Sequence, residues 1–130
     1  MKKKINVVLV DDNPIFLKGL ITYMNNERYD IMASFSSGIE LLSQINYYDP
    51  DIILLDIQMP EMTGIEAASK LNFYGNQLKI VATTLYSESV NVQQLLKAGF
   101  RGMISKNEIG DRLHFVVEKV MDGELVFPND

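Results

Sequence analysis

Four short, largely apolar runs divide the chain, and a charged or hydroxyl-bearing side chain follows each of them. The runs span residues 7–10, 52–55, 80–82 and 102–105. Between them lie longer segments in which apolar residues recur every three or four positions, the spacing of an amphipathic helix. Short strands that alternate with helices are typical of βαβ units around a parallel sheet. The pattern therefore predicts an α/β domain.

The helical spacing predicts helices in five places. The first begins near residues 13–14, because asparagine is a favoured N-cap residue and proline is favoured in the first turn. The second begins at about Gly38, and the third is expected to end at residues 74–76. The apolar residues that define the five helices are Phe16, Leu20, Tyr23 and Met24; Leu41, Leu42 and Ile45; Ile65, Ala68 and Leu71; Val92, Leu95, Leu96 and Gly99; and Ile109, Leu113, Val116, Val117 and Val120.

The order of the strands follows from how apolar each run is. Residues 7–10 and 52–55 are apolar at every position, which predicts interior strands covered by helices on both faces. Ile31, Ala33 and Phe35 occupy alternate positions, as in an edge strand with one buried face. Further strands are expected at 79–83 and at 102–105. With right-handed crossovers, we predict a flavodoxin-like, doubly wound, five-stranded parallel sheet of order 2-1-3-4-5, with five helices on both faces.

Composition narrows the class of protein. The chain has 130 residues, 47% of them hydrophobic, and no cysteine, which indicates one globular domain without disulfides or thiolate metal sites. Its apolar segments are too short for a signal peptide or a membrane span, so we expect a cytoplasmic protein without membrane association. Its net charge of −5 disfavours binding of nucleic acid by this domain, because phosphate contacts need a basic surface.

The residues that end the runs form a candidate site. Asp11 and Asp12 follow the first run, Asp56 the second, Thr84 the third and Lys106 the fourth. Taken singly, each is explained by helix capping, a turn or a solvated surface. In a parallel sheet, however, the carboxyl ends of these strands meet at one crevice. Two carboxylates about 5 Å apart repel by roughly 3 kcal/mol at an effective dielectric of about 20, a cost that a chain selected only for stability would avoid.

A divalent cation would make such an acidic cluster tolerable. Mg²⁺ fits best, since it prefers oxygen ligands and typically uses one or two carboxylates together with phosphate oxygens. A zinc site is not expected, because the chain has no cysteine and a single histidine, His114. An aspartate carboxylate is a known nucleophile toward phosphorus, and phosphoryl transfer needs mainly positioning and charge neutralisation. These residues therefore suit transfer of a phosphoryl group to an aspartate.

From Ile5 to about Gly123 the chain resembles the receiver domains of bacterial two-component response regulators. The resemblance rests on the acidic pair at 11–12, on the D-x-x-M-P-x-x-x-G pattern at 56–64, and on Thr84 and Lys106. It implies that Asp56 is the phosphoacceptor and that the chain is a signalling domain rather than an enzyme, at most catalysing its own phosphorylation and dephosphorylation.

The same resemblance assigns the remaining roles. Asp12 and Asp56 would bind Mg²⁺ directly, Asp11 would act largely through water, and the backbone carbonyl of Gln58 would supply a further ligand. Thr84, rather than Thr83, takes the place of the switch hydroxyl, and Lys106 that of the family's lysine.

Two positions depart from the family pattern. Met103 stands three residues before Lys106, where an aromatic switch residue is common, so rotation of a ring at that site cannot signal activation. Asn107 stands where many relatives have a proline, which leaves the geometry of the Lys106–Asn107 peptide open.

Residues 11–16, 84–86 and 122–124 resemble the NarL/LuxR-type subfamily, whose members usually carry a C-terminal helix-turn-helix domain. We predict a receiver domain at 1–123 and a linker or tail at 124–130, so contact with DNA would require a helix-turn-helix domain that this chain lacks. The favoured interpretation is the receiver part of a transcription regulator, and the alternative is a stand-alone receiver acting through protein contacts. The expected partners are a sensor histidine kinase and, through exposed positions on the first, fourth or fifth helix, a second copy of the chain.

Three other functions fit this set of residues less well. A haloacid-dehalogenase-like phosphohydrolase also uses an aspartate nucleophile and Mg²⁺, but it needs a second acid where this chain has Gln58. A flavodoxin-like cofactor binder needs an anion-binding loop after its first strand, where Asp11 and Asp12 would repel the ligand. A structural scaffold with accidental carboxylates predicts no response to metal.

Overall fold

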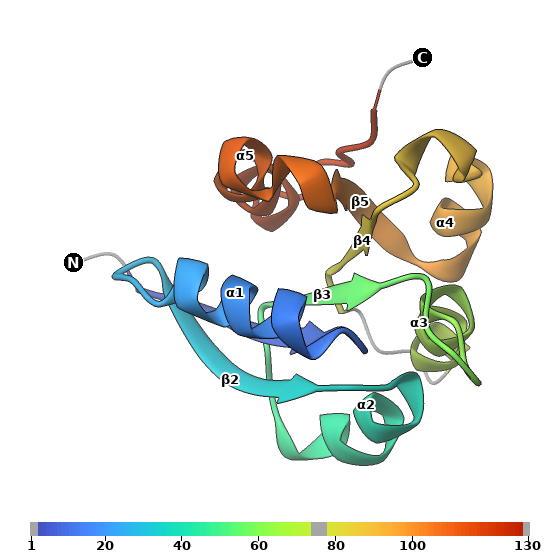
Figure 1. The fold of residues 1–130 in the computed structure, drawn as a ribbon, viewed down its shortest axis with the longest axis horizontal. Helices are drawn as coiled ribbons and strands as arrows, with labels where there is room; N and C mark the ends of the chain where they lie inside the picture. Colours follow the sequence, from blue (N-terminus) through green and yellow to red (C-terminus); the bar gives the residue numbers. More distant parts are fainter. Residues whose placement is uncertain (1–2, 74–77, 129–130) are drawn as a thin grey trace.

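The computed structural model describes residues 3–73 and 78–128, which form a parallel sheet between two layers of helices (Figure 1). The sheet has five strands in the order β2-β1-β3-β4-β5, so the predicted doubly wound topology is confirmed. The strands are β1 Ile5–Val10, β2 Tyr29–Phe35, β3 Ile52–Asp56, β4 Ile80–Thr84 and β5 Phe100–Ser105. The α-helices are α1 Pro14–Met24, α2 Gly38–Gln44, α3 Gly64–Phe73, α4 Val92–Ala98 and α5 Ile109–Met121, and short 3-10 turns span Ile45–Tyr47, Ser87–Ser89 and Lys106–Glu108.

The two central strands bury both of their faces. Val8 and Val10 of β1 pack with residues of α2, α3 and α4, whereas Val7 and Leu9 pack with α1 and α5. The same alternation runs along β3, in which every residue is buried. This arrangement explains why the two runs are apolar at consecutive positions, since each side chain meets a helical layer on one side or the other.

The edge strand β2 differs from the prediction because it contains a β-bulge. Ile31 pairs with Val7, but the next residue of β1 pairs with Ala33, so Met32 is an extra residue in the ladder. The bulge shifts the alternation by one position. As a result, Ile31 packs in the layer of α1 and α5, while Ala33 and Phe35 pack in the opposite layer. The expectation that these three residues share one face was wrong.

All five predicted helices are present. The structure corrects the predicted burial of Tyr23 and the ends of several helices and strands. Tyr23 is exposed rather than part of the buried face of α1, and its hydroxyl donates to the carbonyl of Gly110 at 3.0 Å. Gly99 lies just beyond α4, where its φ of 104° ends the helix in the left-handed conformation that glycine favours. β4 begins and ends one residue later than predicted, and β5 begins two residues earlier. The predicted end of the third helix at 74–76 lies outside the described residues. Within the described ranges, no helix is long and apolar enough to cross a membrane.

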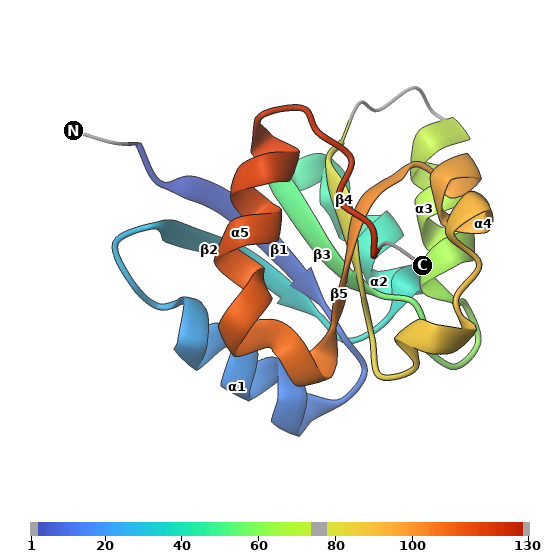
Figure 2. The ribbon, with the colours of Figure 1, turned by 90° about the horizontal axis from the view of Figure 1, so that it is seen from above.

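After α5, the chain returns along the free edge of β5. The amide of Val126 donates to the carbonyl of Arg101 at 2.9 Å, and the amide of Met103 donates to the carbonyl of Val126 at 3.0 Å. These two hydrogen bonds form an isolated parallel bridge between Gly102 and Val126. Figure 2 shows the segment after α5 passing beside β5. The bridge covers part of an edge that would otherwise present unpaired backbone groups.

Gly64 begins α3 directly against the end of β3. A Cβ atom at this position would collide with the carbonyl oxygen of Asp56 and would lie 2.7 Å from Cα of Ile57. These neighbours are backbone atoms, which cannot move aside as a flexible side chain can. Glycine at this position therefore lets the backbone that carries Asp56 and the start of α3 approach closely.

Replacement of Gly64 by alanine should therefore destabilise the fold by about 1–3 kcal/mol, because the added methyl group displaces the backbone of β3. Gly19 is the matched control: it lies within α1 and has nothing within 4 Å of its added Cβ. Gly19→Ala should instead stabilise the protein by about 0.5–1 kcal/mol. Urea denaturation of both variants measures the difference, and an equal response of the two would contradict the close approach.

Candidate functional site

The five predicted side chains gather at the carboxyl end of the sheet. β1 leads into Asp11 and Asp12, β3 ends in Asp56, β4 ends in Thr84, and Lys106 follows β5. Carboxylate oxygens of the three aspartates lie within 4.8 Å of one another. Asp12 is exposed, whereas Asp11, Asp56 and Thr84 are each at most 2% exposed. Two acids are thus buried together and the third faces solvent.

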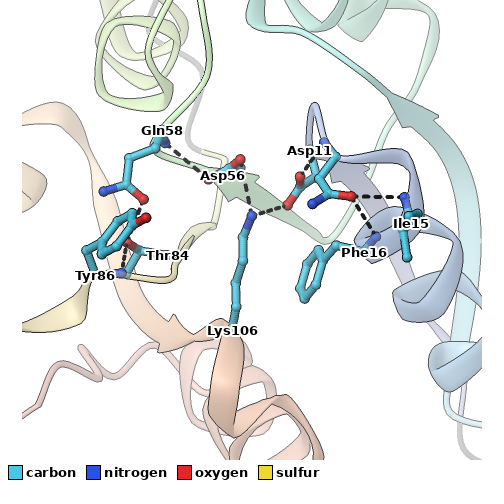
Figure 3. Close-up of polar contacts among 9 residues, drawn as sticks. Asp11, Ile15, Phe16, Asp56, Gln58, Thr84, Tyr86 and Lys106 are labelled. Carbon is cyan, nitrogen blue, oxygen red and sulfur yellow. Dashed lines mark hydrogen bonds and ion pairs between the residues drawn. The ribbon is translucent and has the colours of Figure 1, made fainter.

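Lys106 lies between the two buried acids. Its Nζ is 2.7 Å from Oδ2 of Asp11 and 3.3 Å from Oδ2 of Asp56, and its side chain is only 8% exposed (Figure 3). Oδ2 of Asp11 is buried and, among the described residues, receives no well-directed hydrogen bond, although the ammonium is within ion-pair distance. The two carboxylates are therefore held by a shared positive charge rather than by a complete set of donors.

Backbone amides of the β1–α1 loop orient Asp11 and begin the helix. Oδ1 of Asp11 accepts a hydrogen bond from the amide of Asn13 at 2.8 Å, which leaves Oδ2 facing Lys106. Asn13 is the N-cap of α1, and its side-chain oxygen accepts from the amides of Ile15 and Phe16 at 3.0 and 3.1 Å. Local capping thus connects the direction of the Asp11 carboxylate to the start of α1.

Burial raises the pKa of Asp56 from 3.8 to about 6. The nearby charge of Asp11 adds to this rise, whereas a hydrogen bond from the amide of Gln58 and the charge of Lys106 oppose it. The amide lies 3.1 Å from Oδ1 of Asp56. Because desolvation disfavours a negative charge, the ionised carboxylate is held at a cost, and a group that adds positive charge to the site would relieve that cost.

The hydroxyl of Thr84 is held beside the acidic cluster. It donates to Oε1 of Gln58 at 2.9 Å and accepts from the amide of Tyr86 at 3.0 Å (Figure 3). The sequence points to Gln58 for its backbone carbonyl and as the residue that replaces a phosphohydrolase's second acid, but it does not indicate this side-chain contact with Thr84. Its position two residues after Asp56 was visible in the sequence, but the direction of its side chain was not.

Phe16, expected on the apolar face of α1, also contacts the site. Its ring centroid lies 4.6 Å from Nζ of Lys106, a cation–π contact. No periodicity signals such a contact, because the two residues are 90 positions apart in the sequence.

The two departures from the family pattern also have a place in the structure. Met103 is buried in the layer of α2, α3 and α4. No cis peptide bond occurs in the described part of the chain, so the Lys106–Asn107 peptide is trans. The amide of Asn107 donates to Oγ of Ser105 at 3.3 Å, a hydrogen bond that proline could not make.

The donor set fits Mg²⁺. The three aspartates offer only oxygen atoms, the ligand type that this ion prefers, and they lie close enough for one cation to reach all three. The buried Oδ2 of Asp11 receives no well-directed hydrogen bond among the described residues and shares the Lys106 ammonium with Asp56, so further positive charge would stabilise it.

Comparison with known proteins identifies the family. Residues 7–118 match the family described as the response regulator receiver domain. The transcriptional regulatory protein DegU of Brevibacillus brevis is 28% identical over 123 residues, which is 94% of this chain and 52% of that protein. The chemotaxis protein CheY of Halobacterium salinarum is 32% identical over 100 residues, which is 77% of this chain and 82% of that protein.

A solved structure agrees with the fold. A two-component response regulator of the LuxR family from Aurantimonas sp. SI85-9A1 superposes with a TM-score of 0.85 at 23% identity, covering 95% of this chain and 89% of that one. At that identity, the likeness supports the fold alone. The chain spans 52% to 61% of the length of three curated relatives.

The raised pKa of Asp56 predicts a pH-dependent stability. Well below pH 3.8 the carboxyl is protonated in both the folded and the unfolded chain, so burial carries no charge penalty. As the pH rises from 3.8 to about 6, the unfolded chain releases this proton before the folded chain does, and stability is lost. Above this range the penalty is constant.

Asp56→Asn should therefore raise the free energy of unfolding by about 1–3 kcal/mol at pH 7 in EDTA, with little gain at pH 4. Asp49→Asn, which changes an exposed carboxylate at the other end of β3, should change stability little at either pH. Chemical denaturation at the two pH values provides the measurement. A destabilised Asp56→Asn variant at pH 7 would show that the buried, ionised carboxylate of Asp56 does not destabilise the fold.

Proposed function

The chain belongs to the response regulator receiver family, with relatives of the NarL/LuxR type, and on this premise we propose that it is a phosphorylation-controlled switch whose acceptor is Asp56. The observation that carries the proposal is the position of this carboxylate. It ends the central strand β3, is buried beside Asp11, and lies 3.3 Å from the ammonium of Lys106. A nucleophilic oxygen and a counter-charge for incoming phosphate oxygens are thus side by side.

The proposed reaction is a simple displacement at phosphorus. An oxygen of the ionised Asp56 carboxylate forms a bond to the phosphorus atom of the donor, and the bond from phosphorus to the leaving group breaks. The donor is a phosphohistidine of a sensor histidine kinase or a small acyl phosphate. The product is an acyl phosphate on Asp56, and the leaving group departs with its electron pair. Lys106 neutralises part of the charge on the transferred group.

Mg²⁺ is the proposed cofactor. Asp12 and Asp56 would bind it directly, Asp11 would act largely through water, and the carbonyl of Gln58 would supply a further ligand. When bound, the ion supplies positive charge that neutralises and aligns phosphoryl oxygens. The exposure of Asp12 suits this role, because a cation arriving from solvent can reach its carboxylate without crossing the core.

Thr84 and Lys106 would respond to the charge that phosphorylation adds to Asp56, and their movement would change the surface of the domain. A phosphoryl group adds a charge of about −1.5 to −2 and several hydrogen-bond acceptors. To donate to it, the hydroxyl of Thr84 must leave Oε1 of Gln58, its present acceptor. Leu85 and Tyr86, which follow Thr84, are exposed and lead toward α4. A shift of Thr84 would therefore move the surface around the start of α4.

The output of the whole protein is also part of the proposal. The favoured form is the receiver of a transcription regulator that contacts DNA through a separate helix-turn-helix domain, with a sensor kinase and a second copy of the chain as partners. DegU, a relative named as a transcriptional regulatory protein, favours this form. A stand-alone receiver is the alternative, favoured by the 82% coverage of CheY. A phosphohydrolase is disfavoured, because the side chain of Gln58 has no acidic proton to give a leaving group.

Incubation with acetyl phosphate and Mg²⁺ should add the mass of one phosphoryl group to the wild-type protein. Asp56→Asn should gain none, because an amide is a poor nucleophile, and EDTA should abolish the gain in the wild type. The exposed Asp49→Asn variant serves as the control and should gain the same mass as the wild type. Intact-mass spectrometry gives the result. An unchanged gain in Asp56→Asn would place the acceptor elsewhere.

Thr84→Val should accept the phosphoryl group but lose the conformational response, because it lacks the hydroxyl that would move. NMR amide shifts of residues 85–98, recorded with beryllofluoride and Mg²⁺, report this response. Thr83→Val is the matched control: it removes the preceding hydroxyl of β4, which points to the opposite face of the sheet. Loss of the response in Thr83→Val, or its survival in Thr84→Val, would show that Thr84 is not the switch residue.

A further inference from the structure

The ammonium of Lys106 lies over the ring of Phe16. This ring is part of the site, but the proposed function gives it no role. The distance from Nζ to the ring centroid is 4.6 Å. In Figure 3 the ring lies beside the ammonium, below the carboxylate of Asp11, and Asp56 lies above the ammonium. Phe16 is partly buried and packs against the core layer of α1 and α5.

These contacts enclose the lysine. An ammonium has three N–H donors, and two of the directions around Lys106 lead to the carboxylates of Asp11 and Asp56, at 2.7 and 3.3 Å. The face of an aromatic ring carries partial negative charge, so Phe16 offers the cation a third favourable neighbour. The side chain of Lys106 is 8% exposed, which leaves little room for water to replace any of the three.

One short segment supplies two of these partners. Asp11 is oriented by the amide of Asn13, and the side chain of Asn13 accepts from the amide of Phe16 at 3.1 Å. The N-cap therefore fixes both the carboxylate and the backbone that carries the ring. An aliphatic residue at position 16 could fill the same space beside the core, but it would offer no negative face to the ammonium.

We propose that Phe16 is a positioning residue for phosphoryl transfer, whose ring holds the Lys106 ammonium between Asp11 and Asp56. This inference rests on the proposed function of Asp56 as the acceptor. The ring keeps the counter-charge directed at the acceptor carboxylate before the donor arrives. Without the ring, Lys106 has one favourable neighbour fewer and more freedom to turn toward solvent.

The first test compares rates of phosphorylation by acetyl phosphate with saturating Mg²⁺. Phe16→Leu should react about tenfold more slowly than the wild type, which corresponds to about 1.4 kcal/mol. Phe16→Tyr, which keeps the ring face, should restore a rate close to that of the wild type. In a Lys106→Ala background, Phe16→Leu should have no further effect, because the cation is gone.

The matched control is Phe115→Leu. The ring of Phe115 lies over Arg112 and Lys119 at 4.8 and 5.7 Å, but it is exposed on α5 and away from the acidic cluster. This variant loses the same ring and the same kind of contact, yet its rate should match that of the wild type. Thermal melting of every variant identifies any loss that comes from unfolding.

A second readout does not depend on phosphorylation. Ring current should shift the ε-methylene protons of Lys106 upfield in the NMR spectrum of the wild type and of Phe16→Tyr, and this shift should vanish in Phe16→Leu. Equal rates for Phe16→Leu and the wild type, or equally slow Leu and Tyr variants, would overturn the proposal. If the wild type itself accepts no phosphoryl group, the proposed function fails, and the ring-current shift still decides whether the ring holds the lysine.

Discussion

The burial of two like charges next to one lysine is the constraint on which the site depends. Asp11 and Asp56 are both almost fully buried, and Lys106 is within ion-pair distance of each. One positive charge cannot fully compensate two negative ones; burial raises the pKa of Asp56, and the charge of Asp11 adds to the rise. The site is therefore balanced so that added positive charge, or conversion of one carboxylate to an acyl phosphate, changes its energy more than it would at an exposed surface. A switch needs such sensitivity.

The fold supplies this arrangement through backbone features rather than through a large number of side-chain bonds. The strand order brings the ends of β1, β3, β4 and β5 to one rim. Gly64 lets α3 begin against the backbone of Asp56, and the N-cap of α1 orients Asp11. The hydroxyl of Thr84, in contrast, is held by an exposed glutamine side chain and one amide, an arrangement that can rearrange without disturbing the core. Rigid support for the acids and a loosely held hydroxyl suit a domain that must accept charge and then change its surface.

Much of this could be predicted from the sequence, because topology alone decides which strand ends meet. The buried runs at 7–10 and 52–55 indicated the central strands, and the residues that follow them indicated the site. The face of Ile31 could not be predicted, since the bulge at Met32 is a feature of the register between two strands. The contacts of Gln58 with Thr84 and of Phe16 with Lys106 depend on the direction of side chains far apart in the sequence. Periodicity carries no information about such directions.

The most direct test of the account follows the Asp56 carboxyl carbon by NMR through a pH titration, first in EDTA and then with Mg²⁺. Without metal, the midpoint should lie near the raised pKa of about 6, because the carboxylate is buried beside Asp11. With Mg²⁺ the midpoint should fall, since a bound cation favours the ionised form. A midpoint near the ordinary value of 3.8 in EDTA, unchanged by Mg²⁺, would contradict the claim that buried, mutually repelling acids form the site.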